Sequence, residues 1–193
     1  MEYKNILGAI AVAITFVSFI WYFRDVFYGQ TKPHLFSWLV WGLLELIAYF
    51  AQVAKGAGPG AWVTVSSGLL CLCVFVIAIP RGEKNITRLD WISFLGALFG
   101  LALWIITKNP LSAVVLASFT DFLGFIPTFR KAYHKPQEET VILYASSCVK
   151  LVLAMIALHS FNLTTSLYPA SLLVTNALFV TMVLIRRKQK HVY

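Results

Sequence analysis

Seven apolar runs of about 20 residues follow one another along the chain, and they restrict its possible folds more than any other feature. A helix of about 20 apolar residues spans the hydrocarbon core of a bilayer. Because lipid offers no hydrogen bonds to the backbone, runs of this kind are helical. The sequence predicts an all-α integral membrane protein with seven transmembrane helices, at residues 5–23, 34–54, 61–80, 89–107, 111–129, 139–160 and 167–185.

The composition excludes an ordinary soluble domain. Of the 193 residues, 59% are hydrophobic and only 12% are charged, whereas soluble domains are about 25% charged. A soluble fold of this length could not bury so much apolar surface in one core. The net charge of +8 comes from short basic clusters between the apolar runs, which is typical of loops that face anionic lipid rather than nucleic acid. We expect the lipid bilayer as a partner and no nucleic acid.

The basic residues also predict the orientation. Loops on one side of the seven spans carry twelve Lys and Arg residues, and loops on the other side carry three. The positive-inside rule then places the amino terminus outside and the carboxy terminus in the cytoplasm. The first run is followed by Arg24 and lacks a cleavage site, so we expect it to be a retained helix. Without targeting signals, the plasma (cytoplasmic) membrane is the expected location.

An internal repeat is visible when the chain is shifted by 103 residues. The shift lays the first two runs onto the fifth and sixth, so that Lys32-Pro33 meets Lys135-Pro136 and Trp41 meets Tyr144. Two three-helix units that are separated by one additional helix have the same orientation across the membrane. The pattern predicts a 3+1+3 parallel repeat, with units at residues 1–87 and 110–193 joined by a linker helix within 88–109.

This layout resembles the PQ-loop superfamily, which includes the SWEET sugar transporters, and the related folds of nicotinamide riboside transporters and the KDEL receptor. Residues 124–131 read Gly-Phe-Ile-Pro-Thr-Phe-Arg-Lys, and Pro127-Thr128 stands where that family has a Pro-Gln pair. Arg24-Asp25 stands at this place in the first repeat. The resemblance implies a SWEET-like fold that moves a solute through a site between the repeats by alternating access. It does not imply that the solute is a sugar.

Three ionisable residues, Glu45, Asp121 and Lys150, lie within the predicted spans, where a charge costs about 2.5–3.5 kcal/mol. Glu45 is predicted to bind a cationic or hydroxyl group, or to take up a proton. The alternative is an ion pair of Lys150 with Glu45 or Asp121 that only holds the bundle together. Asp121 is predicted to serve structure or gating because it lies near Pro127, which favours a bend in its helix. Such a bend could be a hinge or a static kink.

Polar and aromatic residues recur at helical spacing in the second and sixth runs. Because these runs are equivalent in the repeat, the two stripes are predicted to form opposite walls of one cavity. Their aromatic members could stack on a ring-shaped or cationic solute, or anchor the helices at the membrane interface. The stripes comprise Trp38, Trp41, Glu45 and Gln52 in the second run, and Thr140, Tyr144, Ser147 and Lys150 in the sixth.

Two further candidates come from the third and seventh runs. Aligning Pro59 with Pro169 brings Ser66 opposite Asn176. SWEET transporters use a polar residue, often Asn, at about this level to bind substrate, so the resemblance implies that role for Asn176 and Ser66. The alternative is an interhelical hydrogen bond, which is common for Ser and Asn in membranes.

These features together predict a transporter of a small polar solute. The alternative is a seven-helix receptor or sensor that binds a ligand without moving it. An enzyme is not expected because the sequence contains no paired His, metal-binding cluster or activated Ser or Cys motif, and no cofactor or metal is predicted. The G-x-x-x-G pattern of Gly96 and Gly100 in the linker helix is compatible with a homodimer.

Overall fold

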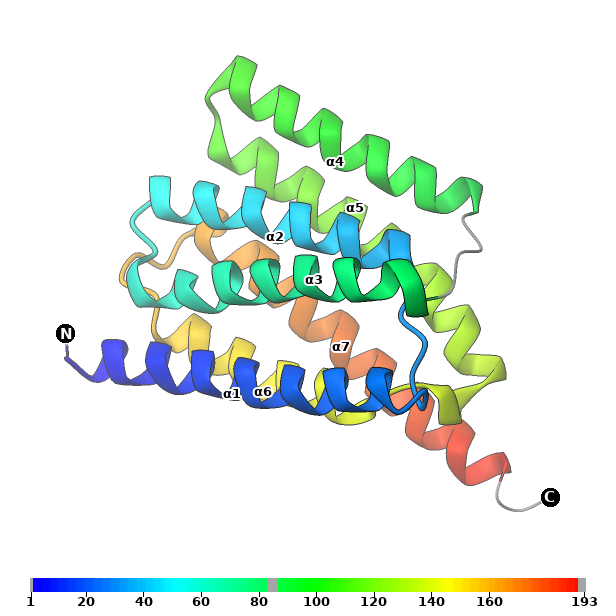
Figure 1. Ribbon diagram of the computed structural model, residues 1–193. Helices are drawn as coiled ribbons and strands as arrows, with labels where there is room; N and C mark the ends of the chain where they lie inside the picture. The colour runs from blue at the N-terminus through cyan, green and yellow to red at the C-terminus, as the bar shows by residue number, and fades with distance from the viewer. Residues whose placement is uncertain (1, 83–86, 191–193) are drawn as a thin grey trace.

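The computed structural model describes residues 2–82 and 87–190. Within these residues the regular structure is helical, which confirms the predicted all-α class (Figure 1). Short 3-10 helices, η1 (Gly58–Ala61) and η2 (Pro136–Glu138), precede α3 and α6. The α-helices are α1 (Glu2–Phe27), α2 (Leu35–Ala54), α3 (Trp62–Arg81), α4 (Arg88–Thr107), α5 (Pro110–His134), α6 (Val141–Ile156) and α7 (Leu163–Lys190).

Length and composition make the chain a multi-pass membrane protein. Among the described residues, five helices are long and apolar enough to cross a bilayer: α1, α2, the continuous η1–α3 segment, α5 and α7. The remaining helices are α4, with 20 residues, and α6, with 16. Large apolar side chains cover the outside of the bundle, and Phe16, Ile20 and Val76 are examples that are about half exposed or more. Such a surface is suited to lipid.

The predicted sixth span, 139–160, is too long at both ends. Glu139 has an extended backbone, with φ −121° and ψ 135°, and α6 begins only at Val141. At the other end the helix stops at Ile156, and the amide of His159 donates to the carbonyl of Ala57 at 2.9 Å. Both boundaries depend on contacts with distant loops, which the apolar pattern of the run does not contain.

Six helices form a closed ring and the seventh lies outside it. Around the ring the packed neighbours are α1, α3, α2, α5, α7 and α6, and α6 returns to α1. Within each consecutive group of three, the third helix lies between the first and second. Helix α4 packs against α5 and α2 at the edge of the bundle (Figure 1).

Small residues allow the helices to approach closely. A Cβ at Gly42 in α2 would lie 2.6 Å from Cδ2 of Leu72 in α3. A Cβ at Gly96 in α4 would lie 2.9 Å from the hydroxyl of Thr120 in α5. Gly96 therefore packs within its own chain, and Gly100, the other glycine of the pattern, lies outside the residues whose surroundings are described. The structure thus places Gly96 in the α4–α5 contact, and the homodimer stays a prediction.

The end of the bundle that holds η1, called the far end here, is tightly closed. Ala57, Ala61 and Leu158 are buried together there. The Nζ of Lys4 donates to the carbonyl of Leu158 at 2.6 Å, and Nε2 of Gln52 donates to the carbonyl of Thr165 at 3.3 Å. These contacts join α1, α2 and η1 to the α6–α7 connection. The opposite end, called the basic end, holds the 28–34 and 135–140 loops and the carboxy-terminal part of α7 (Figure 1).

Gly60 provides a test of the close packing at the far end. A Cβ at this position would lie 2.6 Å from the carbonyl oxygen of Ala154 in α6, and backbone cannot move aside as a side-chain tip can. We expect Gly60→Ala to lower the free energy of unfolding by about 1–3 kcal/mol, measured as a lower Tm of the purified protein in detergent. The exposed position Val76 serves as control. Equal Tm values for Gly60→Ala and Val76→Ala would contradict this packing.

Candidate functional site

A cavity of about 60 Å³ lies at the centre of the ring, between the α1–α3 and α5–α7 groups. All six ring helices contribute to its wall, with Phe19 coming from α1. The wall combines charged, hydroxyl, amide and aromatic side chains, an unusual mixture for the centre of an apolar bundle. Its polar and large aromatic members include Trp38, Trp41, Glu45, Thr64, Ser67, Asp121, Phe125, Tyr144, Ser147, Lys150, Tyr168 and Asn176.

Most of the residues that the sequence singled out meet at this central cavity. Glu45, Trp41, Trp38, Asn176, Tyr144, Lys150 and Ser147 line it, together with Asp121. Their proximity follows from the structure, and their role in binding stays a prediction. The side chain of Pro127, the predicted hinge, lies outside the described residues, although α5 runs through that position.

Three other residues that the sequence placed on the cavity walls, Gln52, Thr140 and Ser66, do not line this cavity. Gln52 donates to the carbonyl of Thr165 at the far end, and Thr140 lies in the 135–140 loop.

Ser66 faces its own helix. Its hydroxyl donates to the carbonyls of Trp62 and Val63 in its own helix, at 2.8 and 3.0 Å. The next residue, Ser67, lines the cavity instead. One position along a helix rotates a side chain by about 100° around the axis. An alignment of α3 with α7 that rests on one proline in each does not fix that rotation.

Lys150 is held by a hydroxyl and an aromatic ring. Its Nζ donates to Oγ of Ser67 at 2.7 Å and lies 5.7 Å from the centre of the Phe19 ring. Among the described residues, Lys150 forms no ion pair with Glu45 or Asp121. The ammonium and the two carboxylates therefore share a cavity without a direct ion pair between them.

Four polar atoms around the central cavity are buried without a well-aligned hydrogen bond. Nε1 of Trp41 and Oε2 of Glu45 have no partner, whereas Oδ1 of Asp121 and the hydroxyl of Tyr168 interact with each other but are poorly aligned. Buried polar groups in folded proteins are nearly always paired. A cluster of buried polar atoms with incomplete hydrogen bonding, two of them on carboxylates, is the arrangement expected where a polar solute binds.

An aromatic layer, formed by Trp38, Trp41 and Tyr144, separates this cavity from a larger one. All three side chains line both spaces. The ring centres of Trp38 and Trp41 are 5.3 Å apart, and those of Tyr144 and Phe179 in α7 are 4.3 Å apart. Trp41 also packs on Phe125 of α5 at 4.9 Å. Movement of these rings would connect the two spaces.

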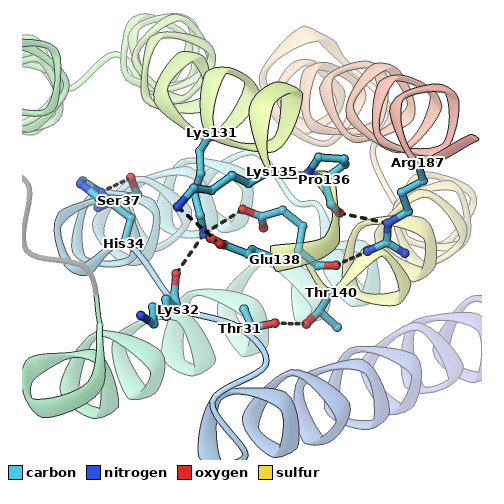
Figure 2. Close-up of polar contacts among 11 residues, drawn as sticks. Thr31, Lys32, His34, Ser37, Lys131, Lys135, Pro136, Glu138, Thr140 and Arg187 are labelled. Carbon is cyan, nitrogen blue, oxygen red and sulfur yellow. Dashed lines mark hydrogen bonds and ion pairs between the residues drawn. The ribbon is translucent and has the colours of Figure 1, made fainter. Parts of the chain in front are cut away.

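The larger space, called the vestibule, has a volume of about 230 Å³ and lies at the basic end. The two Lys-Pro loops meet beside it (Figure 2). The Nζ of Lys131 lies 3.1 Å from Oε1 of Glu139 and donates to the carbonyl of Lys32 at 3.2 Å. The hydroxyls of Thr31 and Thr140 are 2.7 Å apart. The second and third of these contacts join one half of the ring to the other, and the ion pair ties Lys131 to the loop of its own half. The three contacts together are called the loop bridge.

Helices α1 and α7 hold the loop bridge in place. Thr140 donates to Oδ2 of Asp25, near the end of α1, at 2.8 Å. From α7, the guanidinium of Arg187 donates to the carbonyls of Glu139 at 2.7 Å and Pro136 at 3.0 Å (Figure 2). The sequence analysis did not identify Asp25, Glu139 or Arg187 as site residues. The repeat held one signal, because the 103-residue shift places Asp25 opposite Thr128, a residue that lines the vestibule.

Glu139 lies outside the helices and is 6% exposed. Burial raises the pKa of its carboxyl above the ordinary value because the charged form loses water. Lys131 and Arg187 oppose this increase, and the neighbouring Glu138 adds to it. The net direction is upward, so the Glu139 carboxyl takes up a proton at a higher pH than a free glutamate does.

No protein-family model, curated protein or solved structure matches this chain. Its function therefore has to be inferred from the two spaces and the side chains around them.

The raised pKa of Glu139 predicts a pH-dependent stability. Because the folded protein holds this proton more tightly than the unfolded chain, the stabilising contribution is greatest below the pKa of a free glutamate. It is lost as the pH rises through the raised pKa. The Tm of the native protein relative to Glu139→Gln should therefore fall as the pH rises above about 4, the pKa of a free glutamate.

The control for this measurement is Thr31→Val, which removes a hydrogen bond between two neutral hydroxyls. Its Tm difference from the native protein should stay constant over the same range of pH. If the Tm of the native protein instead increased relative to that of Glu139→Gln as the pH rose, the result would contradict a raised pKa of Glu139.

Proposed function

We propose that this chain is a membrane transporter that moves a small polar solute through the central cavity by alternating access. The main support is the convergence of Glu45, Asp121, Lys150 and Asn176 on one cavity between two groups of three helices. Carboxylate, indole and phenol atoms with incomplete hydrogen bonding face that cavity. A packed structural core would leave neither the space nor such polar atoms.

The two ends of the bundle favour transport over simple ligand storage. At the basic end the vestibule reaches inward to the aromatic layer. At the far end, buried Ala57, Ala61 and Leu158 close the bundle. With the basic end in the cytoplasm, as the positive-inside rule requires, this arrangement corresponds to a state reached from the cytoplasm as far as Trp38, Trp41 and Tyr144.

The order of helices around the ring supports the 3+1+3 repeat and the SWEET-like architecture. The α1–α3 and α2–α3 contacts have counterparts in α5–α7 and α6–α7, and the α1–α6 contact has its counterpart in α5–α2. Helix α4 stands outside the ring as a linker would. We propose that all seven α-helices span the bilayer, with the PQ-loop superfamily as the structural relative. The 16 residues of α6 are about 24 Å long, so the adjoining residues complete its span.

Alternating access requires one end to open as the other closes, and the loop bridge is positioned for this role. It joins the two halves through two hydrogen bonds, from Lys131 to the carbonyl of Lys32 and between Thr31 and Thr140, and the ion pair with Glu139 holds Lys131 in place. Rocking of the three-helix groups would break these polar contacts and separate apolar side chains of the shared core, such as Val26 and Ala132. Pro127, near the end of α5 that carries Lys131, is the proposed hinge for this motion.

Ligand-induced stabilisation provides the first test of the proposal. Sugars, amino acids, amines and vitamins would be screened by the Tm of the purified protein at about pH 5.5 and about pH 7.5, because a ligand at 100 times its Kd adds about 2.7 kcal/mol. We expect at least one of these solute classes to raise the Tm of the native protein and to leave the Tm of Glu45→Gln unchanged. The control is Glu2→Gln, an exposed carboxylate at the start of α1.

A stabilising ligand would then be tested for flux into vesicles that contain the purified protein. Counterflow of the labelled ligand supports transport. Tight binding without flux would contradict the proposal and favour the receptor or sensor alternative. Equal stabilisation of the native protein and of Glu45→Gln would remove the central cavity as the binding site.

The proposed orientation has a separate test. Because twelve of the Lys and Arg residues lie on one side, the carboxy-terminal end of this chain is expected in the cytoplasm and its amino-terminal end outside. Fused to the carboxy-terminal end, a green fluorescent protein should fluoresce and an alkaline phosphatase should be inactive. Active phosphatase at that end would reverse the assignment of the vestibule to the cytoplasm.

A further inference from the structure

The side chains around the central cavity define the charge of the solute that it can hold. Two acids, Glu45 from α2 and Asp121 from α5, face a single base, Lys150 from α6. The other titratable groups that face them, Cys71 from α3, Tyr144 from α6 and Tyr168 from α7, are neutral in their usual forms. Fully ionised, the cavity carries one negative charge in excess, which is costly inside a bilayer. One proton or one monovalent cation would balance it.

The hydrogen-bonding atoms favour a cation that carries N–H donors. Oε2 of Glu45 is a buried acceptor without a partner, and Oδ1 of Asp121 has only a poorly aligned interaction with the hydroxyl of Tyr168. The Lys150 ammonium is already bonded to Ser67. It offsets the charge of one carboxylate and leaves the oxygens of both open. An ammonium group has three donors in a compact head, which suits such a set of acceptors.

The aromatic side chains and the size of the cavity further restrict the class of solute that it can bind. Trp41, Tyr144 and Phe125 surround the same space as the carboxylates, and aromatic faces attract organic cations. A metal ion such as Ca²⁺ prefers six to eight oxygen ligands, which a wall of rings does not supply. The volume of about 60 Å³ corresponds to roughly four to six water molecules at about 10–15 Å³ for each. An amine of four to six non-hydrogen atoms has a similar size.

We propose that the central cavity binds a small primary ammonium ion and exchanges it for a proton held by Glu45 and Asp121. This inference rests on the proposed transport function. When the amine leaves, one proton from water binds a carboxylate oxygen of the pair. When the amine returns, that proton is released to the vestibule. Each exchange moves one positive charge in each direction, so the charge of the cavity stays constant through the cycle.

A zwitterion or an anion matches the charge of the central cavity less well than an ammonium ion does. A zwitterion adds no net charge and leaves the excess negative charge in place, and an anion increases it. A neutral polyol would use these acceptors through its hydroxyls but would also leave the charge unbalanced. The charge count therefore separates four solute classes that otherwise have similar sizes.

The experiment uses vesicles that contain the purified full chain and four labelled solutes of similar size: ethanolamine (a cation), glycerol (neutral), glycine (a zwitterion) and acetate (an anion). Each vesicle set is preloaded with the same unlabelled solute, and a lumenal dye reports pH. We expect protein-dependent counterflow of ethanolamine alone. In a second assay, ethanolamine is added to vesicles that were not preloaded with it, and we expect its uptake to make the lumen alkaline. Vesicles without protein serve as the control for passive entry of the free base, and their lumen should become less alkaline.

Two variants separate binding chemistry from folding. Glu45→Gln removes an ionised acceptor, and a hydrogen bond to a charged group is worth about a tenfold change in affinity or more. Lys150→Gln increases the excess negative charge, so ethanolamine affinity should be retained or increased. A purely structural role of these residues would weaken binding in both variants. The Tm and the size-exclusion profile of each variant establish that it is folded.

The outcomes distinguish this inference from the transport proposal. Counterflow of glycerol, glycine or acetate in preference to ethanolamine would overturn the amine assignment and leave transport standing. Ethanolamine counterflow with no lumenal alkalinisation beyond that of protein-free vesicles would overturn proton exchange. If ethanolamine stabilises the protein but no solute of the four or of the wider panel is moved, the transport proposal itself is wrong.

Discussion

The ionisable side chains at the centre of the bundle determine much of what surrounds them. Removing a carboxylate or an ammonium from water is expensive unless partners compensate. Glu45, Asp121 and Lys150 come from three different helices and meet inside a ring of six. The Ser67 hydroxyl and the Phe19 ring stabilise the ammonium, while the hydrogen bonding of the carboxylate oxygens remains incomplete. The apolar exterior facing lipid and the polar interior facing the cavity are therefore two consequences of one arrangement.

The two ends of the bundle are closed by different kinds of interaction. At the far end the closure is made by small buried residues, and Gly60 lies so close to α6 that a Cβ would contact its backbone. Such packing has little freedom to adjust. At the basic end the halves meet through hydrogen bonds from Lys131 to the carbonyl of Lys32 and between the hydroxyls of Thr31 and Thr140, beside a buried apolar cluster. Polar contacts beside a vestibule can exchange with water at a small net cost, so under the proposed transport mechanism they would separate more easily than the packing at the far end.

The sequence alone predicted the helices and eight of the residues that line the cavity, largely because helices and shared helix faces follow from periodicity. Apolar runs of bilayer length identify helices, and Glu45, Trp41 and Trp38 share a face because of the helical repeat. Contacts between distant segments could not be predicted in this way. The start of α6, the rotation that places Ser67 rather than Ser66 in the cavity, and the links from Asp25 and Arg187 to the 135–140 loop all depend on tertiary packing. Tyr168 was missed because nothing in its local pattern distinguishes it from an anchoring aromatic residue.

The proposed repeat makes the distribution of charge informative. Under the 103-residue shift, Trp41 is equivalent to Tyr144, so both halves contribute an aromatic ring to the layer above the cavity. The charged residues have no such counterparts, because Glu45 corresponds to Cys148, Asp121 to Ser18, and Lys150 to Ile47. If the scaffold is duplicated as proposed, each charged residue of the cavity occurs in one half alone. The aromatic layer is symmetric between the two proposed units, as rocking of equivalent units would require. The charged residues are not symmetric, and they would therefore hold a solute in a single orientation.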